Sequence, residues 1–436
     1  MIAESKRQQI ISLVKREVIP AIGCTEPIAV ALCVAKATEM LGTQPEAIDV
    51  FLSGNMLKNA MGVGIPGTGM AGLPIAIALG ALIGKSEYQL EVLRDVNPDA
   101  VARGKEYMAS TPISIGLKED CPDKLYIEVC VKAADMSATA VIAHDHTHFV
   151  LLSRESAKAG KEILLDEPLT ATGDGDDDAV DLNLRIVYDF ATTAPLAEIE
   201  FINEARRLNE NASRQSLLGN YGHELGKTLS RPLGRGIMGD SMFSHILSAT
   251  SSACDARMAG AIIPVMSNSG SGNQGIAATM PVVVFGEENH NTEEELTRAL
   301  MLSHLTAIYI KQSLGKLSAL CGCVVASTGS SCGITYLMGG SYEQVAFSVK
   351  NMIANLAGMV CDGAKPSCAL KVSSGVSTAV LSAMLAIQNK HVSSVEGLIE
   401  DDVDRCIHNL TRIGADGMNE TDRMVLDIMT HKQPQC

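Results

Sequence analysis

The 436-residue chain contains no tryptophan, and only 3% of its residues are aromatic. The core must therefore be formed mainly by the aliphatic part of its 46% hydrophobic residues, which suits closely packed helices. Basic residues are also few: 35 Lys and Arg stand against 50 Asp and Glu, for a net charge of −15. Nucleic-acid binding needs a basic surface, so we expect no nucleic-acid partner.

Long hydrophobic runs are absent as well. The longest, residues 71–83, is too short to span a bilayer and contains Gly and Pro. The first residues, M-I-A-E-S-K-R, predict a charged amphipathic helix and not a signal peptide. We therefore expect a cytoplasmic protein without a membrane partner. Its twelve cysteines would be thiols, ligands or nucleophiles, because disulfides are rare in that compartment.

Five of those cysteines lie within residues 318–371, among Gly, Ser and Ala. Small residues let the backbone approach an inorganic group and donate N–H hydrogen bonds to it. The last two cysteines are seven residues apart with Asp, Gly and Pro between them, which predicts a loop. No paired C-x₂-C motif occurs, which disfavours structural zinc. We interpret the stretch as an iron–sulfur site; its cysteines are Cys321, Cys323, Cys332, Cys361 and Cys368.

Near the N-terminus, a predicted helix over residues 5–19 ends at Pro20 and is followed by G-C-T-E-P. Thr25 suits an N-cap, so Cys24 would stand just before the next helix. The positive end of a helix lowers the pKa of a nearby thiol and makes it reactive. The alternative is that Cys24 is a small buried residue at a turn.

Two polar stretches suggest ligand contacts. Residues 48–70 predict a short strand, then Asn55, Lys58 and Asn59, then a Gly-rich loop; Lys58 would pair with a carboxylate and the two amides would orient it. Gly-rich segments are usually turns, so spacing alone favours a simple turn over anion binding, and the glycines match no nucleotide-binding signature. The second stretch, S-N-S-G-S-G-N-Q-G at residues 267–275, lies between apolar flanks. Buried polar groups need partners, so we favour an amino-acid ligand over a solvent loop. The residues are Ser267, Asn268, Ser269, Gly270, Ser271, Gly272, Asn273 and Gln274.

From about residue 90 to 200 the sequence becomes strand-like, with β-branched residues in alternation. We therefore predict an α+β protein: a mainly helical catalytic domain of residues 1–88 and 196–436, with a smaller inserted α/β domain of residues 89–195. His144, His146 and His148 would share one face of a strand. We favour a solvated or partner-facing strand over a zinc site, because no fourth ligand is suitably spaced.

Four motifs together resemble the L-cysteine desulfidase family, which is related to the α-chain of iron–sulfur L-serine dehydratases. They are G-C-T-E-P, S-N-S-G-S-G-N-Q-G, C-G-C and C-D-G…P-S-C, and they occur in family order over nearly the whole chain. The resemblance implies an oxygen-sensitive [4Fe–4S] cluster and conversion of L-cysteine to pyruvate, ammonia and hydrogen sulfide.

The resemblance also implies roles for single residues. Cys361 and Cys368 match two cluster ligands, and the third falls at Cys321, with Cys323 as the alternative. Cys24 would act as a base or a labile ligand. The related dehydratases have a C-terminal cysteine that reaches the cluster, so Cys436 leaves a tail-bound resting state open.

The 267–275 loop, with Asn55, Lys58 and Asn59, would hold the carboxylate and ammonium groups of a small amino-acid substrate. L-Serine is the nearest alternative substrate. A pyridoxal-phosphate lyase with Lys58 or Lys227 as the Schiff base, and a non-catalytic iron–sulfur sensor of cysteine or redox state, are further alternatives. The sequence leaves a homo-oligomer open.

Overall fold

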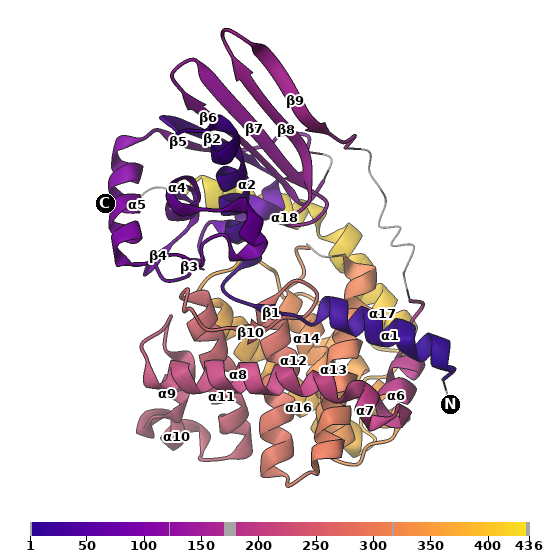
Figure 1. Cartoon of the computed structure of the whole chain (residues 1–436). Coiled ribbons are helices and arrows are strands. Elements are labelled where there is room, and N and C mark those ends of the chain that lie inside the picture. The colour runs from indigo at the N-terminus through magenta and orange to yellow at the C-terminus, as the bar shows by residue number, and fades with distance from the viewer. Residues whose placement is uncertain (1, 122, 170–179, 316–317, 433–436) are drawn as a thin grey trace.

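The computed structural model describes residues 2–121, 123–169, 180–315 and 318–432. Figure 1 shows two parts: a sheet part around β2 and β5–β9, and a helical part that contains α6–α17. Helix α1 (Glu4–Glu17) lies along the helical part before the chain enters the sheet part. The protein is α+β and mainly helical, as the sequence predicts.

The sheet part contains one six-stranded sheet in the order β5-β2-β6-β7-β8-β9. β2 pairs in parallel with β5, and all other neighbours are antiparallel. A parallel pair needs a long crossover, which the helices between β2 and β5 provide. The strands are β2 (Ala47–Leu52), β5 (Ile113–Leu117), β6 (Tyr126–Ala133), β7 (Met136–Ala143), β8 (Phe149–Ser156) and β9 (Gly160–Asp166).

Helix α2 (Thr25–Leu41) packs on β6 and β7 and is mostly buried. It ends at Gly42, whose φ of 77° forms a left-handed cap. α4 (Leu73–Ile83) crosses α2 closely, because a Cβ on Gly80 would lie 2.6 Å from the Ala31 carbonyl oxygen. The other elements between β2 and β5 are α3 (Gly54–Ala60), β3 (Gly64–Ile65), β4 (Met70–Ala71), η1 (Ser86–Glu91) and α5 (Pro98–Ser110).

The hydrophobic cores divide the chain at different points from the predicted domain limits. Residues between Ile28 and Ile142 form one core with the sheet. The largest core joins the segment before residue 25 to the helices after residue 180. The reason is that β2 is an interior strand, between β5 and β6, so the helices that flank it in sequence must pack on the same sheet. The smaller core therefore begins near residue 25 instead of residue 89.

The centre of the helical part is α12, α13 and α14, packed with α16. Small residues permit close contact: a Cβ on Gly329 of α14 would lie 2.2 Å from the Ser303 carbonyl oxygen of α13. The helices are α6 (Leu184–Thr193), α7 (Leu196–Ile199), η2 (Glu200–Ile202), α8 (Asn203–Leu218), α9 (Leu225–Ser230), α10 (Pro232–Met238), α11 (Met242–Met258), α12 (Gly272–Glu288), α13 (Glu293–Leu314), α14 (Gly322–Leu337), α15 (Tyr342–Leu356) and α16 (Cys368–Ile387).

Helix α16 is the one described helix that is long and apolar enough, by length and composition, to cross a membrane. Half of its apolar window is buried within the protein. It packs against α11, α14 and α15, so we interpret it as a core helix.

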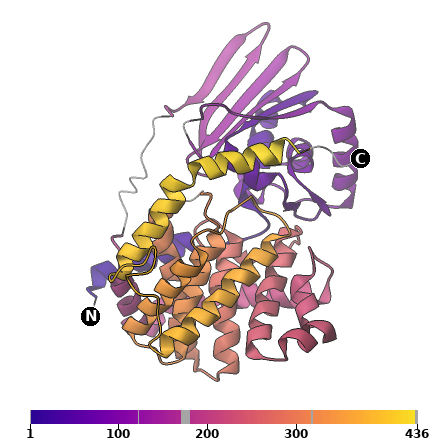
Figure 2. The ribbon, with the colours of Figure 1, turned by 180° about the vertical axis from the view of Figure 1, so that it is seen from behind.

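The C-terminal segment returns to the sheet part. α17 (Val403–Arg412) packs on α13 and α15, a π-turn (η3, Ile413–Gly417) follows, and α18 (Asn419–Thr430) reaches α3. Figure 2 shows this yellow segment running up the back of the molecule, from one part to the other. Cys436 lies outside the described residues.

The predicted histidine strand is wrong. β7 ends at Ala143, and residues 144–148 form a turn in which His144 has a φ of 71°. His144 pairs with Asp123 and His148 with Glu167, so the histidines do not share a strand face.

Candidate functional site

Three cysteines stand at the N-termini of three helices. Cys24 is the N-cap of α2, Cys321 is the N-cap of α14, and Cys368 is the first residue of α16. Helix N-termini carry unpaired N–H groups and a positive dipole end, which favour anions. The prediction that Cys24 stands just before a helix is confirmed, although Cys24 takes the N-cap position expected for Thr25.

A short backbone pairing brings Cys321 and Cys361 together. Leu320 and Val360 form an antiparallel bridge. Cys321 N donates to the Met359 carbonyl at 2.9 Å, and Cys361 N donates to the Ala319 carbonyl at 2.7 Å. The Cys361 thiol hydrogen-bonds to Cys321, which together with burial raises the pKa of Cys361 well above its usual value.

The alternative ligand, Cys323, has different partners. Its Sγ lies 3.1 Å from Met359 Sδ and donates to the Lys371 carbonyl at 3.4 Å. It also receives a hydrogen bond from Cys321, which raises the pKa of Cys321. Contact with Cys361 therefore distinguishes Cys321 from Cys323.

The loop from Cys361 to Cys368 packs tightly on α3. Gly363 has a φ of 88°, and a Cβ there would lie 2.1 Å from the Lys58 carbonyl oxygen. Cys368 Sγ donates to the Gly363 carbonyl at 3.5 Å and interacts electrostatically with Cys361. The structure thus brings two predicted ligands together and places the third within electrostatic range of Cys361.

The described residues contain no group of three or more His, Cys, Asp or Glu side chains arranged to hold a metal ion. The donor chemistry nevertheless fits an iron–sulfur cluster, because soft thiols are the ligands that such clusters take. Cys368 is directed to the Gly363 carbonyl, which separates it from the Cys321–Cys361 pair.

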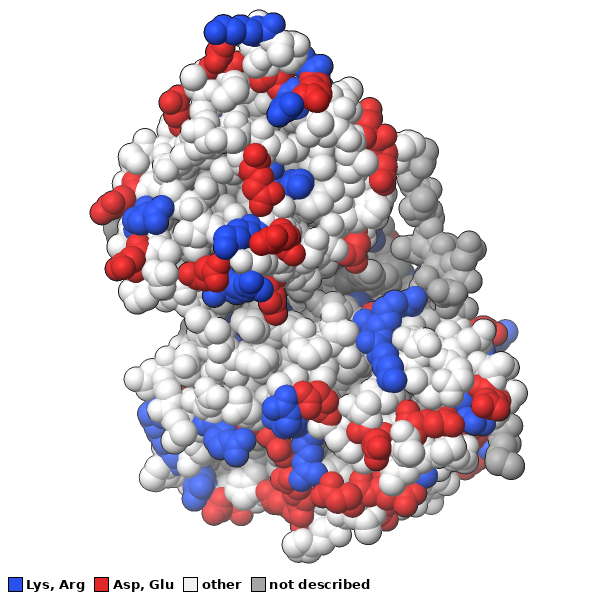
Figure 3. Space-filling view, viewed as in Figure 1, with Lys and Arg blue, Asp and Glu red and all other residues white. Residues whose placement is uncertain are grey.

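Two buried lysines, Lys58 and Lys311, lie within electrostatic range of these thiols. Lys58 is 2% exposed and forms an ion pair with Asp422 of α18. Burial lowers the pKa of Lys311 to about 8, and the charges of Cys361 and Cys321 oppose that shift. On the face in Figure 3, by contrast, acidic and basic side chains are interspersed. Positive charge in the interior suits anionic thiolates.

Cys24 is 2% exposed and accepts a hydrogen bond from Arg257 of α11. Burial raises the pKa of Cys24 to about 12, although Arg257 favours the thiolate. The prediction of a lowered pKa is therefore wrong for this structure, because loss of water outweighs the helix N-terminus and the guanidinium. Cys24 also interacts electrostatically with Cys368.

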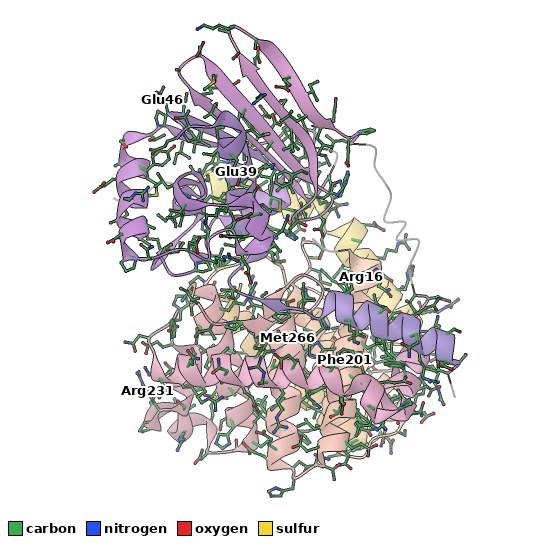
Figure 4. All side chains as sticks on the ribbon, in the orientation of Figure 1. Arg16, Glu39, Glu46, Phe201, Arg231 and Met266 are labelled. Carbon is green, nitrogen blue, oxygen red and sulfur yellow. The ribbon has the colours of Figure 1, made fainter. Side chains whose placement is uncertain are left out.

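The first residues of the 267–275 loop hold the protein itself together. Ser267 Oγ donates to the Ile19 carbonyl at 2.6 Å, next to the pairing of β1 (Pro20–Ala21) with β10 (Val265–Met266). Asn268 Nδ2 donates to His304 Nδ1 and to the His304 carbonyl, both at 3.1 Å, and Ser269 Oγ donates to Asn268 Oδ1. Met266, labelled in Figure 4, lies in the helical part near its boundary with the sheet part. This half of the loop anchors the segment that leads to Cys24.

The second half of the loop begins α12 and approaches the cysteines. Ser271 Oγ caps the helix by accepting from Gln274 N at 3.4 Å. A Cβ on Gly322, next to Cys321, would lie 2.9 Å from the Gln274 side-chain amide carbon. Gln274 Oε1 is buried and has no hydrogen-bond partner among the described residues. Gly270 is exposed at the tip, and Asn273 Oδ1 accepts from Cys254 at 3.4 Å.

The three residues predicted from the 48–70 stretch lie on α3. Asn55 is buried and Asn59 half-buried. Lys58 is next to Cys361 in electrostatic range, but its carboxylate partner is Asp422 from the protein's own C-terminal segment. Whether these residues bind substrate stays a prediction.

Sequence reasoning missed Cys254 and Arg257, which lie one turn apart on α11. Both are buried, and both interact electrostatically with Cys24. A signal was present: Cys, Asp and Arg interrupt the small-residue run S-A-T-S-S-A-C-D-A-R-M-A-G. A charged residue within such a buried helix indicates a polar partner.

A model of the serine dehydratase alpha chain family matches residues 87–427. The chain is 69% identical over 434 residues to the UPF0597 protein of Phocaeicola vulgatus, covering 99% of this chain and 100% of that one. It is 53% identical over 431 residues to the UPF0597 protein of Porphyromonas gingivalis (98% and 99% covered) and 46% identical over 430 residues to that of Shewanella halifaxensis (96% and 97% covered).

The chain belongs to the serine dehydratase alpha chain family. The residues that match the family model include Arg257, the 267–275 loop and the cysteines from Cys321 to Cys368. Cys24 and Lys58 precede the matched residues, but they fall within the length shared with the relatives that match nearly end to end. The N-terminal thiol is thus joined to the family's matched residues by contacts in the fold, through Arg257 and Cys368.

Proposed function

We propose that this protein is an iron–sulfur-dependent lyase that eliminates sulfide from L-cysteine and forms pyruvate, ammonia and hydrogen sulfide. Membership of the serine dehydratase alpha chain family supports a lyase of serine dehydratase type. The observation that carries the proposal is the Leu320–Val360 backbone bridge, which brings Cys321 and Cys361 together. Cys368 is within electrostatic range of Cys361, and Cys24 is within electrostatic range of Cys368. Such an enzyme would work in the cytoplasm.

Cys321, Cys361 and Cys368 would hold a [4Fe–4S] cluster. When bound through three cysteines, such a cluster supplies an open iron that acts as a Lewis acid toward the leaving sulfur. The buried lysines near Cys361 would balance the negative charge of the thiolate ligands. Cys321 is favoured over Cys323 because it makes the contact to Cys361.

Cys24 Sγ is the proposed acceptor of the substrate Cα proton. Arg257 favours its thiolate form and so opposes the burial that raises the pKa of Cys24, and the same burial shields the site from water. In the reaction the Cα–H and Cβ–S bonds break and a Cα=Cβ bond forms. The resulting enamine becomes an imine that water hydrolyses, so L-cysteine and water give pyruvate, ammonium and hydrogen sulfide.

L-Serine is the second candidate substrate, and the description of the matching family favours it. The same proton transfer would then expel hydroxide. The two substrates are separated by comparing kcat/KM for L-cysteine and L-serine on protein purified without oxygen. A higher value for L-serine would replace the cysteine assignment and leave the lyase assignment intact.

The first experiment is a determination of iron and acid-labile sulfide per chain after anaerobic purification. About four of each supports the cluster. Near zero of both, after attempted reconstitution, would sink the mechanism and favour a pyridoxal-phosphate lyase. A loaded protein that turns over neither amino acid would instead be an iron–sulfur sensor.

A further inference from the structure

Arg257 is a buried cation without a carboxylate partner among the described residues. It is 4% exposed, and its Nε makes no hydrogen bond. Its guanidinium interacts with the Cys24 thiol and favours the thiolate form. An uncompensated buried charge is strongly unfavourable, so proteins retain one where a ligand supplies the counter-charge.

The guanidinium of Arg257 lies against the start of α12. A Cβ on Gly272 would lie 2.2 Å from Arg257 Nε and 2.9 Å from Cζ, so the arginine occupies the space that any larger residue would fill. This position is also the positive end of α12, whose N–H groups favour anions. The fork of donors and the helix terminus together suit a carboxylate.

Gln274, two residues after Gly272 in the first turn of α12, provides a hydrogen-bond acceptor where Arg257 provides donors. Its Oε1 is a buried acceptor without a partner among the residues described. Its side chain lies against Gly322, next to Cys321. The first turn of α12 thus lies against Arg257 of α11, whose Nε is unsatisfied, and carries the unsatisfied acceptor of Gln274, which lies against Gly322.

We propose that Arg257 binds the α-carboxylate of an amino-acid ligand and that Gln274 Oε1 accepts from its ammonium group. The assignment deepens the proposed lyase function, on which its identification as a substrate contact rests. In this assignment the ligand carboxylate binds to Arg257 of α11. Lys58 does not bind the ligand carboxylate, because its counter-charge is Asp422. The Cα of the ligand would then be held near Cys24, the neighbour of Arg257.

The test uses binding of L-alanine, which has no leaving group, to the anaerobically purified full chain by calorimetry. Arg257→Gln should weaken binding by about 100-fold, because the ligand carboxylate would be buried without its partner. The affinity of Arg257→Lys for L-alanine should lie between those of wild type and Arg257→Gln, because a lysine keeps the charge but cannot donate two parallel hydrogen bonds to a carboxylate. The matched control Arg405→Gln removes a 73%-exposed arginine and should stay within about twofold of wild type.

L-Alaninamide, which lacks the carboxylate, completes a double-mutant-type cycle that combines two ligands with two protein variants. It should bind wild type weakly and lose nothing further in Arg257→Gln. The ligand-free melting temperature gives a second readout: Arg257→Gln should melt no lower than wild type, because the change removes an unpaired buried charge. A purely structural arginine would lower it.

The proposal is overturned if Arg257→Gln retains its iron and binds L-alanine as wild type does. It is also overturned if that variant melts well below wild type while Arg257→Lys binds normally. If wild type turns over L-cysteine without measurable L-alanine binding, an unchanged KM in Arg257→Gln overturns the proposal and a raised KM supports it. If wild type has neither iron nor turnover but binds L-alanine in a way that depends on Arg257, the lyase proposal is wrong and the Arg257 site stands. If wild type neither binds L-alanine nor turns over L-cysteine, both proposals are wrong.

Discussion

Lys58 and Arg257 are both buried cations beside the candidate cysteines, and they differ in their counter-charge. Lys58, on α3 of the sheet part, has Asp422. Arg257, on α11 of the helical part, has the Cys24 thiol and an unsatisfied Nε. Both charges are removed from water, which is unfavourable without a counter-charge. The protein supplies a carboxylate to Lys58 but none among the described residues to Arg257. The difference indicates that Lys58 joins the two parts and that Arg257 serves a ligand.

The largest effect should come from removing a proposed cluster ligand. Cys361→Ser loses the contact with Cys321 and should abolish iron content and lyase activity together. Iron analysis and sulfide release measure the two losses. Cys130→Ser, in β6 of the sheet part, is the control and should keep both. Activity without iron would remove the cluster from the mechanism.

Cys24→Ser should lose activity by at least about 100-fold and keep its iron, because a hydroxyl is a poor proton acceptor. This change also alters the hydrogen-bond partner of Arg257, so L-alanine binding should persist if Arg257 serves the carboxylate. Steady-state rates and iron content check the prediction. A fully active variant would exclude Cys24 as the base.

Asp422→Ala should turn Lys58 into an unpaired buried charge. We expect a loss of about 2 kcal/mol of unfolding free energy, less than for a fully buried pair because the Asp422 side chain is 21% exposed. Urea unfolding measures it. Asp427→Ala, on the same helix but at an exposed pair with His431, should change little. The double variant with Lys58→Met should recover part of the loss, and failure to recover would mean that α18 docks by its apolar contacts alone.

His304 is also buried, and it avoids the cost of a buried charge by remaining neutral. Burial lowers its pKa to about 3, and Nδ1 accepts from Asn268. Because the folded-state pKa lies below the unfolded value of about 6.5, this contribution to stability is complete well above pH 6.5. It falls as pH drops toward 3, by about 1.4 kcal/mol between pH 8 and pH 5.5. Urea unfolding at pH 8 and pH 5.5 should show this loss, and His304→Gln should reduce it.

Local chemistry allowed much of the site to be predicted. The small residues and cysteines of the 318–371 stretch pointed to one inorganic site, and Cys321 and Cys361 are in contact. Local sequence also sets helix ends, since the capping box of Thr292 and Glu295 begins α13. The 267–275 loop was recognised as polar sequence within apolar flanks, because such groups need partners wherever they are buried.

Other features depended on partners distant in sequence. The pKa of Cys24 is set by dehydration within the fold, which reversed the expected shift. Half of the 267–275 loop binds the segment before Cys24, and the polar pattern alone did not distinguish protein from ligand partners. The interior position of β2 moved residues 25–88 into the core of the sheet part.

The sequence by itself determined the candidate metal-ligand atoms: twelve thiols in an acidic, aromatic-poor chain, with small residues around the cysteines of residues 318–371. Composition and spacing settle which side chains exist and which local turns they favour. Only the tertiary structure decided which charges meet. Lys58 pairs with a residue 364 positions away, and Arg257 finds no carboxylate among the described residues. Burial makes that distinction costly, and burial is a property of the folded chain.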